Sequence, residues 1–232
     1  MTFEALLDAL ALPRGALVDR RIPKKLLTEE RAPTAADKRK IMDGIEELHW
    51  VAALKPSNTG VAAFTDSVRE YLEVQVLTAR VRPAAKTSGL IEMVHRTIPY
   101  PIFLICESEE ILTISLARKR RSLGGDGKIV MEQLRLARLG AGSPSRAERD
   151  FLESLAFSRQ PAQDLFVLYE GWVRRLAALA VARITGTFRL PEASGSIDTL
   201  WEKLAARERL EREVAGLRAK AEKEKQINRR VA

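Results

Sequence analysis

The residues of this chain best suited to chemistry are carboxylates near one predicted strand. Glu73 and Gln75 lie in the segment 71–81, where apolar and polar residues alternate, and Asp66 and Glu70 precede them. Two neighbouring carboxylates can hold a divalent metal ion such as Mg²⁺ beside a phosphate group. Asp66, Glu73 and Gln75 are therefore the candidate residues for a divalent-metal site. We treat this as the alternative, and a non-catalytic protein without a cofactor as the preferred hypothesis.

Other catalytic chemistries have little support in the sequence. The chain has two histidines, His49 and His95, and one cysteine, Cys106, which excludes a multi-histidine metal centre, a multi-cysteine zinc site and an intrachain disulfide. The glycine-rich segment 124–128 is not a P-loop, because Ile129 follows its lysine where a serine or threonine is required. We expect packing or surface roles for both histidines and a buried, unreactive Cys106.

Positive charge is concentrated in two segments. The chain has 39 Lys and Arg against 31 Asp and Glu, a net charge of +8. Residues 14–40 and 118–149 hold nine bases each, against four acids in the first segment and three in the second. Such clusters can neutralise phosphates, whereas the few aromatic residues disfavour a base-stacking surface. Solvated loops without a ligand are the alternative. The predicted DNA-contacting residues are Arg20, Arg21, Lys24, Lys25, Arg118, Lys119, Arg120 and Arg121.

The first half of the chain predicts an α+β fold with a small mixed sheet. A helix at 3–10 precedes a basic arm at 14–40, and a second helix runs from 34 to the residues before Pro56, although 51–54 also reads as a short strand. Pro83 and Pro99 delimit a crossover helix. Around it we expect a β-α-β-β core with strands at 61–64, 71–81, 100–106 and 111–117.

The second half predicts helices. They are expected at 128–139, 145–155, 161–186 and from 197 onward, which divides the chain into a core domain (1–122), a helical region (123–190) and a long coiled-coil-like helix (191–232). The last helix carries an apolar stripe that must pack on something. We expect it to contact a second copy, a larger partner or the helix bearing Trp172. The stripe residues are Leu204, Leu210, Val214 and Leu217.

The longest apolar runs are too short to cross a membrane. Residues 98–106 and 176–182 fall well below the roughly 18 residues that span a bilayer, and acidic residues stand where a signal peptide carries basic ones. We expect a cytoplasmic protein without membrane contact.

The order of predicted elements resembles the α-β-β-β-α-β core of the PD-(D/E)xK nucleases. In that fold an Asp and a Glu bind the metal, and a Lys one residue past the Glu stabilises charge. Glu73 and Gln75 take the corresponding strand positions here, but glutamine replaces the lysine and Asp66 lies in a turn. The resemblance therefore implies a degenerate or cryptic nuclease as the alternative function.

Several segments resemble a bacterial family known as domain of unknown function 4391, with Arg20, Arg21, Lys24, Lys25 and the Lys119 region in its motifs. Its members are often encoded beside helicases and DNA methyltransferases of restriction-like or phage-defence systems. The resemblance implies an accessory component of a DNA-directed complex, with a helicase or methyltransferase as possible partner. An interaction scaffold without nucleic-acid binding is a third hypothesis. The segments are LVDRRIPKK (17–25), IEELHW (45–50), EVQV (73–76) and IPYPI (98–102).

Overall fold

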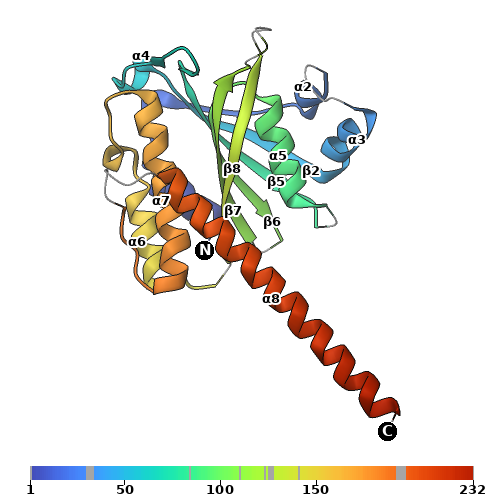
Figure 1. Ribbon diagram of the computed structural model, residues 1–232. Helices are drawn as coiled ribbons and strands as arrows, with labels where there is room; N and C mark the ends of the chain where they lie inside the picture. Colours follow the sequence, from blue (N-terminus) through green and yellow to red (C-terminus); the bar gives the residue numbers. More distant parts are fainter. Residues whose placement is uncertain are drawn as a thin grey trace. The chain divides into compact units, whose positions relative to one another are not determined.

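The computed structural model describes residues 2–29, 34–83, 85–109, 111–122, 124, 128–140, 142–191 and 197–231. The chain divides into two compact units, residues 1–188 and 189–232. The first unit is built on a six-stranded sheet of order β1-β2-β5-β6-β7-β8 (Figure 1). Its strands are β1 (Leu17–Arg21), β2 (Ile45–Leu54), β5 (Val74–Val81), β6 (Ile102–Ser108), β7 (Ile111–Arg121) and β8 (Ile129–Gly140).

The sheet is mixed, which confirms the predicted α+β class. Only β5 and β6 are parallel neighbours in this sheet; the other adjacent pairs are antiparallel. Parallel neighbours need a crossover, and helix α5 (Thr87–Thr97) provides it. The crossover helix predicted between Pro83 and Pro99 is therefore confirmed, although it begins at Thr87.

One face of the sheet is covered by α5 together with α2 (Lys24–Glu29) and α3 (Ala35–Gly44). Apolar residues of these helices form a buried cluster with alternate residues of β5 and β6. The cluster includes Leu27, Ile41, Leu77, Ala79, Leu90, Ile91, Val94, Leu104 and Cys106.

The opposite face is covered by α7 (Leu165–Thr185), which packs with α6 (Arg146–Ser154) and through it with α1 (Phe3–Leu10). The Trp172 ring meets the Phe103 ring edge-on at 5.2 Å. Buried Arg175 donates to backbone carbonyls of Ser154, Gly171 and Arg159, which ties the turn after α6 to α7. Burial, with a contribution from Arg159, lowers the pKa of Arg175 to about 10, so the guanidinium stays charged at neutral pH.

A small subdomain follows β2. It consists of α4 (Pro56–Thr59) and the hairpin of β3 (Phe64–Thr65) and β4 (Glu70–Tyr71), and a short turn of helix, η1 (Arg14–Ala16), lies against it. Phe64 stacks on Phe166 of α7 at 4.9 Å. A second short helix, η2 (Phe157–Arg159), links α6 to α7. These contacts hold the segment between β2 and β5 on the α7 side.

The helix predicted from 34 to the residues before Pro56 is wrong over its second half. Helix α3 ends at Gly44, and residues 45–54 form β2, so the strand alternative for 51–54 is correct. A Cβ at Gly44 would lie 2.6 Å from Leu90 Cδ1, which shows how closely α3 approaches α5 there. Beyond Gly44 the chain pairs with β1 on one side and β5 on the other, and this pairing overrides local helix propensity.

The helix predicted over 128–139 is also wrong, because residues 129–140 form strand β8. Leu134 and Leu136 share the α5 side of the sheet, whereas Ala137 and Leu139 are buried on the other side. The side chains of this segment therefore alternate between the two faces of the sheet, although many of its residues favour helices. The region 123–190 is helical only beyond β8.

The second unit contains α8 (Ile197–Val231), a helix of 35 residues. Among the described residues, no helix is both long and apolar enough to span a membrane.

Candidate functional site

The three upstream carboxylates of the predicted nuclease site each have a partner of their own. Asp66 Oδ1 accepts hydrogen bonds from the backbone N–H groups of Arg69 and Val68, which lower the pKa of this carboxyl. Glu70 Oε1 lies 3.3 Å from a guanidinium nitrogen of Arg121. Glu73 Oε2 lies 2.9 Å from Lys55 Nζ. These partners satisfy the carboxylates within the fold.

Gln75 is placed apart from this chemistry, in the buried part of the sheet. Its side chain is buried, and its Oε1 has no hydrogen-bond partner. In the described parts of the chain, no group of three or more His, Cys, Asp and Glu residues could hold a metal ion. Asp66 and Glu73 thus each have a partner other than Gln75, and the predicted site of Asp66, Glu73 and Gln75 stays a prediction.

The basic residues 118–121 lie on strand β7, not in a loop. Arg118 is held by both carboxylate oxygens of Glu170 on α7, at 2.7 and 2.6 Å. Arg120 lies 3.7 Å from Glu132, and Arg121 pairs with Glu70. The charge of these three arginines is balanced by acids distant in sequence.

Lys119 is the buried member of this group. It is 2 % exposed, and its Nζ donates to the backbone carbonyls of His95 and Ile98 at the end of α5. A cation at a helix C-terminus satisfies free carbonyls and interacts favourably with the helix dipole. Lys119 therefore serves the fold and has no surface from which to contact a phosphate.

Part of the predicted basic arm forms the edge strand β1. The register shifts between Leu17 and Arg20, and Asp19 has φ +48°, which marks a β-bulge. His49 Nε2 lies 2.7 Å from Asp19 Oδ1 across the strand pair. A bulge at an edge re-aims the side chains that follow it, here Arg20 and Arg21.

The other two basic residues predicted nearby differ in role. Lys24 Nζ donates to the carbonyls of Met42 and Ile45, at 2.9 and 2.8 Å, and thereby closes the end of α3. Lys25, next in sequence, is exposed, and its ammonium group bonds to no described residue. Arg21 forms an ion pair with Glu47 at 3.6 Å, with its side chain 69 % exposed.

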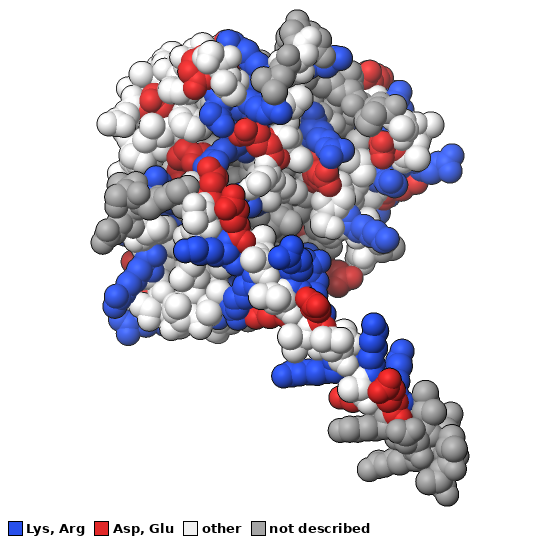
Figure 2. Space-filling view, in the orientation of Figure 1, with Lys and Arg blue, Asp and Glu red and all other residues white. Residues whose placement is uncertain are grey.

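Four exposed residues on β1, α2 and α3 have side-chain cations with no hydrogen bond or ion pair to any described residue. We call them the free basic surface: Arg20, Lys25, Lys38 and Arg39. Helices α2 and α3 are in contact, and α2 follows β1 directly. In Figure 2, Lys and Arg side chains project from the region where Figure 1 places these helices, with acidic side chains between them.

The apolar stripe of α8 remains largely solvent-exposed. Leu210, Val214 and Leu217 are 57 %, 46 % and 58 % exposed, and Leu204 is half-buried. These are large values for apolar side chains spaced along one helix, so this segment offers an unpartnered face.

The packing role predicted for His95 and the buried, unreactive state predicted for Cys106 are confirmed. His95 is fully buried with Nε2 3.0 Å from Ser115 Oγ, and burial together with the charge of Lys119 lowers its pKa to about 3. Burial raises the pKa of Cys106 to about 12, so its thiol stays protonated and unreactive.

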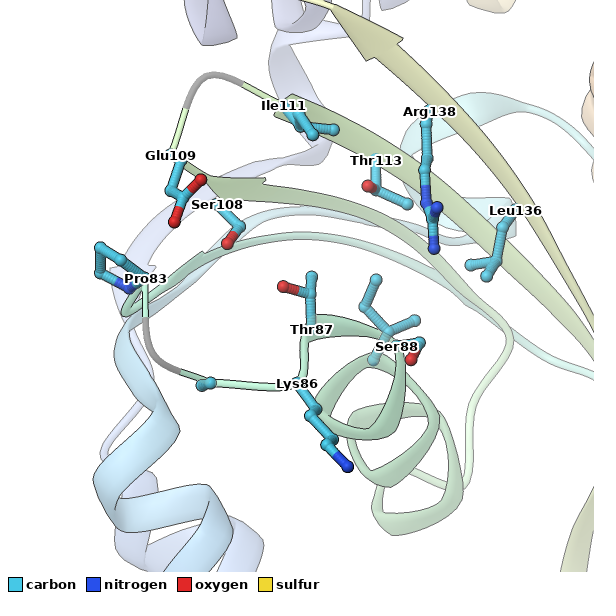
Figure 3. A pocket seen from close by; sticks show the side chains of 12 residues that line it. Pro83, Lys86, Thr87, Ser88, Ser108, Glu109, Ile111, Thr113, Leu136 and Arg138 are labelled. Atoms are coloured by element: carbon cyan, nitrogen blue, oxygen red, sulfur yellow. The ribbon is translucent and has the colours of Figure 1, made fainter. Parts of the chain in front are cut away.

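The sequence reasoning missed a pocket of about 360 Å³ at the start of α5 (Figure 3). It lies where β5 and β6, the parallel strands, end and the crossover helix begins. Ligands of open α/β sheets bind at this kind of position. A parallel pair flanking a Pro-bounded helix that opens with Thr87 and Ser88 was the available signal.

Comparison with protein families shows where the chain belongs. With its mixed six-stranded sheet and long terminal helix, it is an α+β protein. The family model described as Domain of unknown function (DUF4391) matches residues 10–232, and the chain belongs to this family. Comparison with curated proteins and with solved structures found no match.

Proposed function

We propose that this protein is an accessory, non-catalytic component of a bacterial DNA-directed complex that binds nucleic-acid backbone. The observation that carries the proposal is the free basic surface, four exposed cations without partners among the described residues. Cations that are already solvated and unpaired can neutralise phosphates without breaking an ion pair. Binding of this kind is independent of sequence and suits a component that is directed by a partner such as a helicase or methyltransferase.

The proposal is tested by fluorescence anisotropy with labelled duplex DNA at low and at physiological salt. We expect weak binding at low salt that falls steeply as salt is added. Arg20→Glu with Lys25→Glu should weaken it at least tenfold. The matched control is Arg146→Glu with Arg159→Glu, exposed cations on the α6 side that cause the same change of charge.

Two results would contradict the proposal. Absence of binding at low salt favours an interaction scaffold without a nucleic-acid role. Equal loss in both double variants makes the binding a property of net charge alone.

We also propose that α8 pairs with α8 of a second copy. The exposed stripe of Leu210, Val214 and Leu217 supports this, since two such stripes can bury each other. Acids and bases both flank the stripe, so a pair of such helices can bring acids of one copy against bases of the other. These flanking residues are Glu211, Glu213, Arg218 and Lys220.

Analytical ultracentrifugation tests the pairing. We expect the wild type to sediment as a dimer and Leu210→Glu with Leu217→Glu to sediment as a monomer. The control Ala205→Glu with Ala219→Glu places the same charges on the opposite side of the helix and should remain dimeric. A monomeric wild type contradicts the pairing and leaves the stripe to a larger partner protein.

A cryptic nuclease is the second candidate. The order α3, β2, β5, α5 and β6, with an antiparallel then a parallel pair, supports a relation to the PD-(D/E)xK core. Nuclease members of that fold carry a lysine at the position that Gln75 occupies here. Lys55, whose ammonium group lies 2.9 Å from Glu73, could supply the missing positive charge. Mg²⁺- or Mn²⁺-dependent DNA cleavage that is lost in Glu73→Ala would establish this candidate and overturn a non-catalytic role; we expect no cleavage.

A further inference from the structure

The pocket at the start of α5 has walls from three parts of the sheet unit. Thr87 and Ser88 come from the first turn of the helix, Thr113 from β7 and Arg138 from β8. Ile91 and Leu136 give it an apolar floor. Its volume of about 360 Å³ is in the range of small-molecule sites.

The two ends of α5 differ in how their charge is satisfied. The C-terminal end has a buried cation, because Lys119 Nζ donates to its carbonyls. The N-terminal end has no acidic residue in its first turn and no side-chain cap at Lys86. The amide N–H groups of Thr87 and Ser88 have no carbonyl within the helix to bind, and they carry the positive end of the helix dipole. The first turn of α5 therefore supplies no acidic side chain of its own to this end.

Thr113 is the independent indication that a ligand belongs here. It is 4 % exposed, and its hydroxyl has no hydrogen-bond partner among the described residues. Figure 3 shows its side chain projecting from the sheet into the pocket, toward Thr87. The hydroxyl lines the pocket, where a polar group of a bound ligand can exchange a hydrogen bond with it.

Arg138 lies directly across from Thr113 in the β7–β8 register, so the two side chains share this face of the sheet. Its guanidinium extends toward Ser88 in Figure 3 and has no carboxylate partner in the described parts of the chain. Arginine binds phosphate oxygens in a two-point geometry, and helix N-termini bind phosphate through their amides. The guanidinium of Arg138, the hydroxyl of Thr113 and the first turn of α5 thus line the same pocket.

We propose that this pocket binds the phosphate group of a small organic phosphate, held by Arg138, Thr113 and the first turn of α5. A phosphate monoester offers oxygens to all three donors at once. The carboxylate of Glu109 lies on the pocket wall, where it can accept hydrogen bonds from hydroxyls of a sugar. The same carboxylate disfavours the next phosphate of a polynucleotide, so the small molecule is the favoured source of the phosphate.

Isothermal titration calorimetry with the full chain tests the proposal. The probes are inorganic phosphate, AMP and adenosine, with a 5′-phosphorylated and a 5′-hydroxyl oligonucleotide to separate the two sources of a phosphate monoester. We expect AMP to bind more tightly than phosphate and adenosine not to bind. Arg138→Gln should weaken AMP at least tenfold, and Thr113→Val, which keeps the side-chain shape, should weaken it several-fold.

Arg146→Gln is the control, because it removes an exposed cation on the α6 side and should leave AMP binding unchanged. Absence of AMP and phosphate binding, or equal effects of Arg138→Gln and Arg146→Gln, would overturn the proposal. If the 5′-phosphorylated oligonucleotide binds more tightly than AMP and this binding depends on Arg138, the ligand is a nucleic-acid end and the small-molecule proposal is wrong. Duplex binding through the free basic surface is expected to be insensitive to Thr113→Val, so the two proposals can fail separately.

Discussion

The two basic segments of this chain hold nine positive residues each, and four residues of each segment differ sharply in how the fold treats their charge. In the second segment, Arg118, Arg120 and Arg121 pair with acids, and Lys119 is buried under the end of α5. In the first segment, the free basic surface has no partners among the described residues. The count of charges in a sequence therefore measures neither their availability nor their function.

The difference follows from topology. Strand β7 lies inside the sheet, with α7 on one face and α5 on the other, so its cations meet Glu170 on a helix and Glu132 on the neighbouring strand. Strand β1 is an edge with one neighbour, and α2 and α3 follow it at that end of the sheet. Cations on interior strands need partners, because unpaired buried charge is costly, whereas cations on an edge can stay in water.

The largest effect is expected at Lys119. Lys119→Met leaves the carbonyls of His95 and Ile98 without their donor and should lower the free energy of unfolding by about 3 kcal/mol. Urea denaturation measures the change. Lys25→Met is the matched control from the free basic surface and should change stability by less than about 0.5 kcal/mol. Similar effects at both positions would contradict the contrast between the segments.

The second prediction concerns pH. Because the pKa of His95 is lowered to about 3 in the folded state from an ordinary value of 6.5, the unfolded chain binds a proton first as pH falls. Stability is therefore lost below about pH 6.5, by about 1.4 kcal/mol per pH unit. Between pH 7 and 5 the wild type should lose about 2 kcal/mol more than His95→Gln. A pH response in His95→Gln equal to that of wild type would refute the assignment.

The third prediction compares one ion pair from each segment. Arg118 and Glu170 are 18 % and 13 % exposed in a two-point contact, whereas Arg21 and Glu47 are 69 % and 41 % exposed. Double-mutant cycles with Arg118→Met and Glu170→Gln should give a coupling of about 1–2 kcal/mol. The Arg21–Glu47 cycle should give less than about 0.5 kcal/mol. The reverse order would show that burial does not separate the two segments.

The local sequence predicts well the elements whose ends are marked by special residues. Pro83 and Pro99 bound α5, and the apolar run after Pro101 gives β6. It fails at β2 and β8, because both contain Glu, Leu and Ala residues that favour helices while their state is set by strands paired beside them. The local sequence pattern of these two segments does not reveal which strands will pair with them.

The candidate sites show the same limit. The run 118–121 is correctly identified as basic, but its partners at 70, 132 and 170 are brought near only by the fold. The pocket at the start of α5 depends on the register that sets Thr113 opposite Arg138. The exposed stripe of α8, by contrast, is predicted from spacing alone, because a single helix fixes which residues share a face.

The most direct test of the central claim is the salt dependence of duplex DNA binding in two double variants. Arg20→Gln with Lys25→Gln removes two free cations, and Arg120→Gln with Arg121→Gln removes two paired ones, with the same change of charge. If the free cations contact phosphates, the slope of log K against log salt should fall by about 1.8 in the first variant, about 0.9 for each lost contact. It should stay at the wild-type value in the second. Equal slopes in both variants, or a larger fall in the second, would contradict the account.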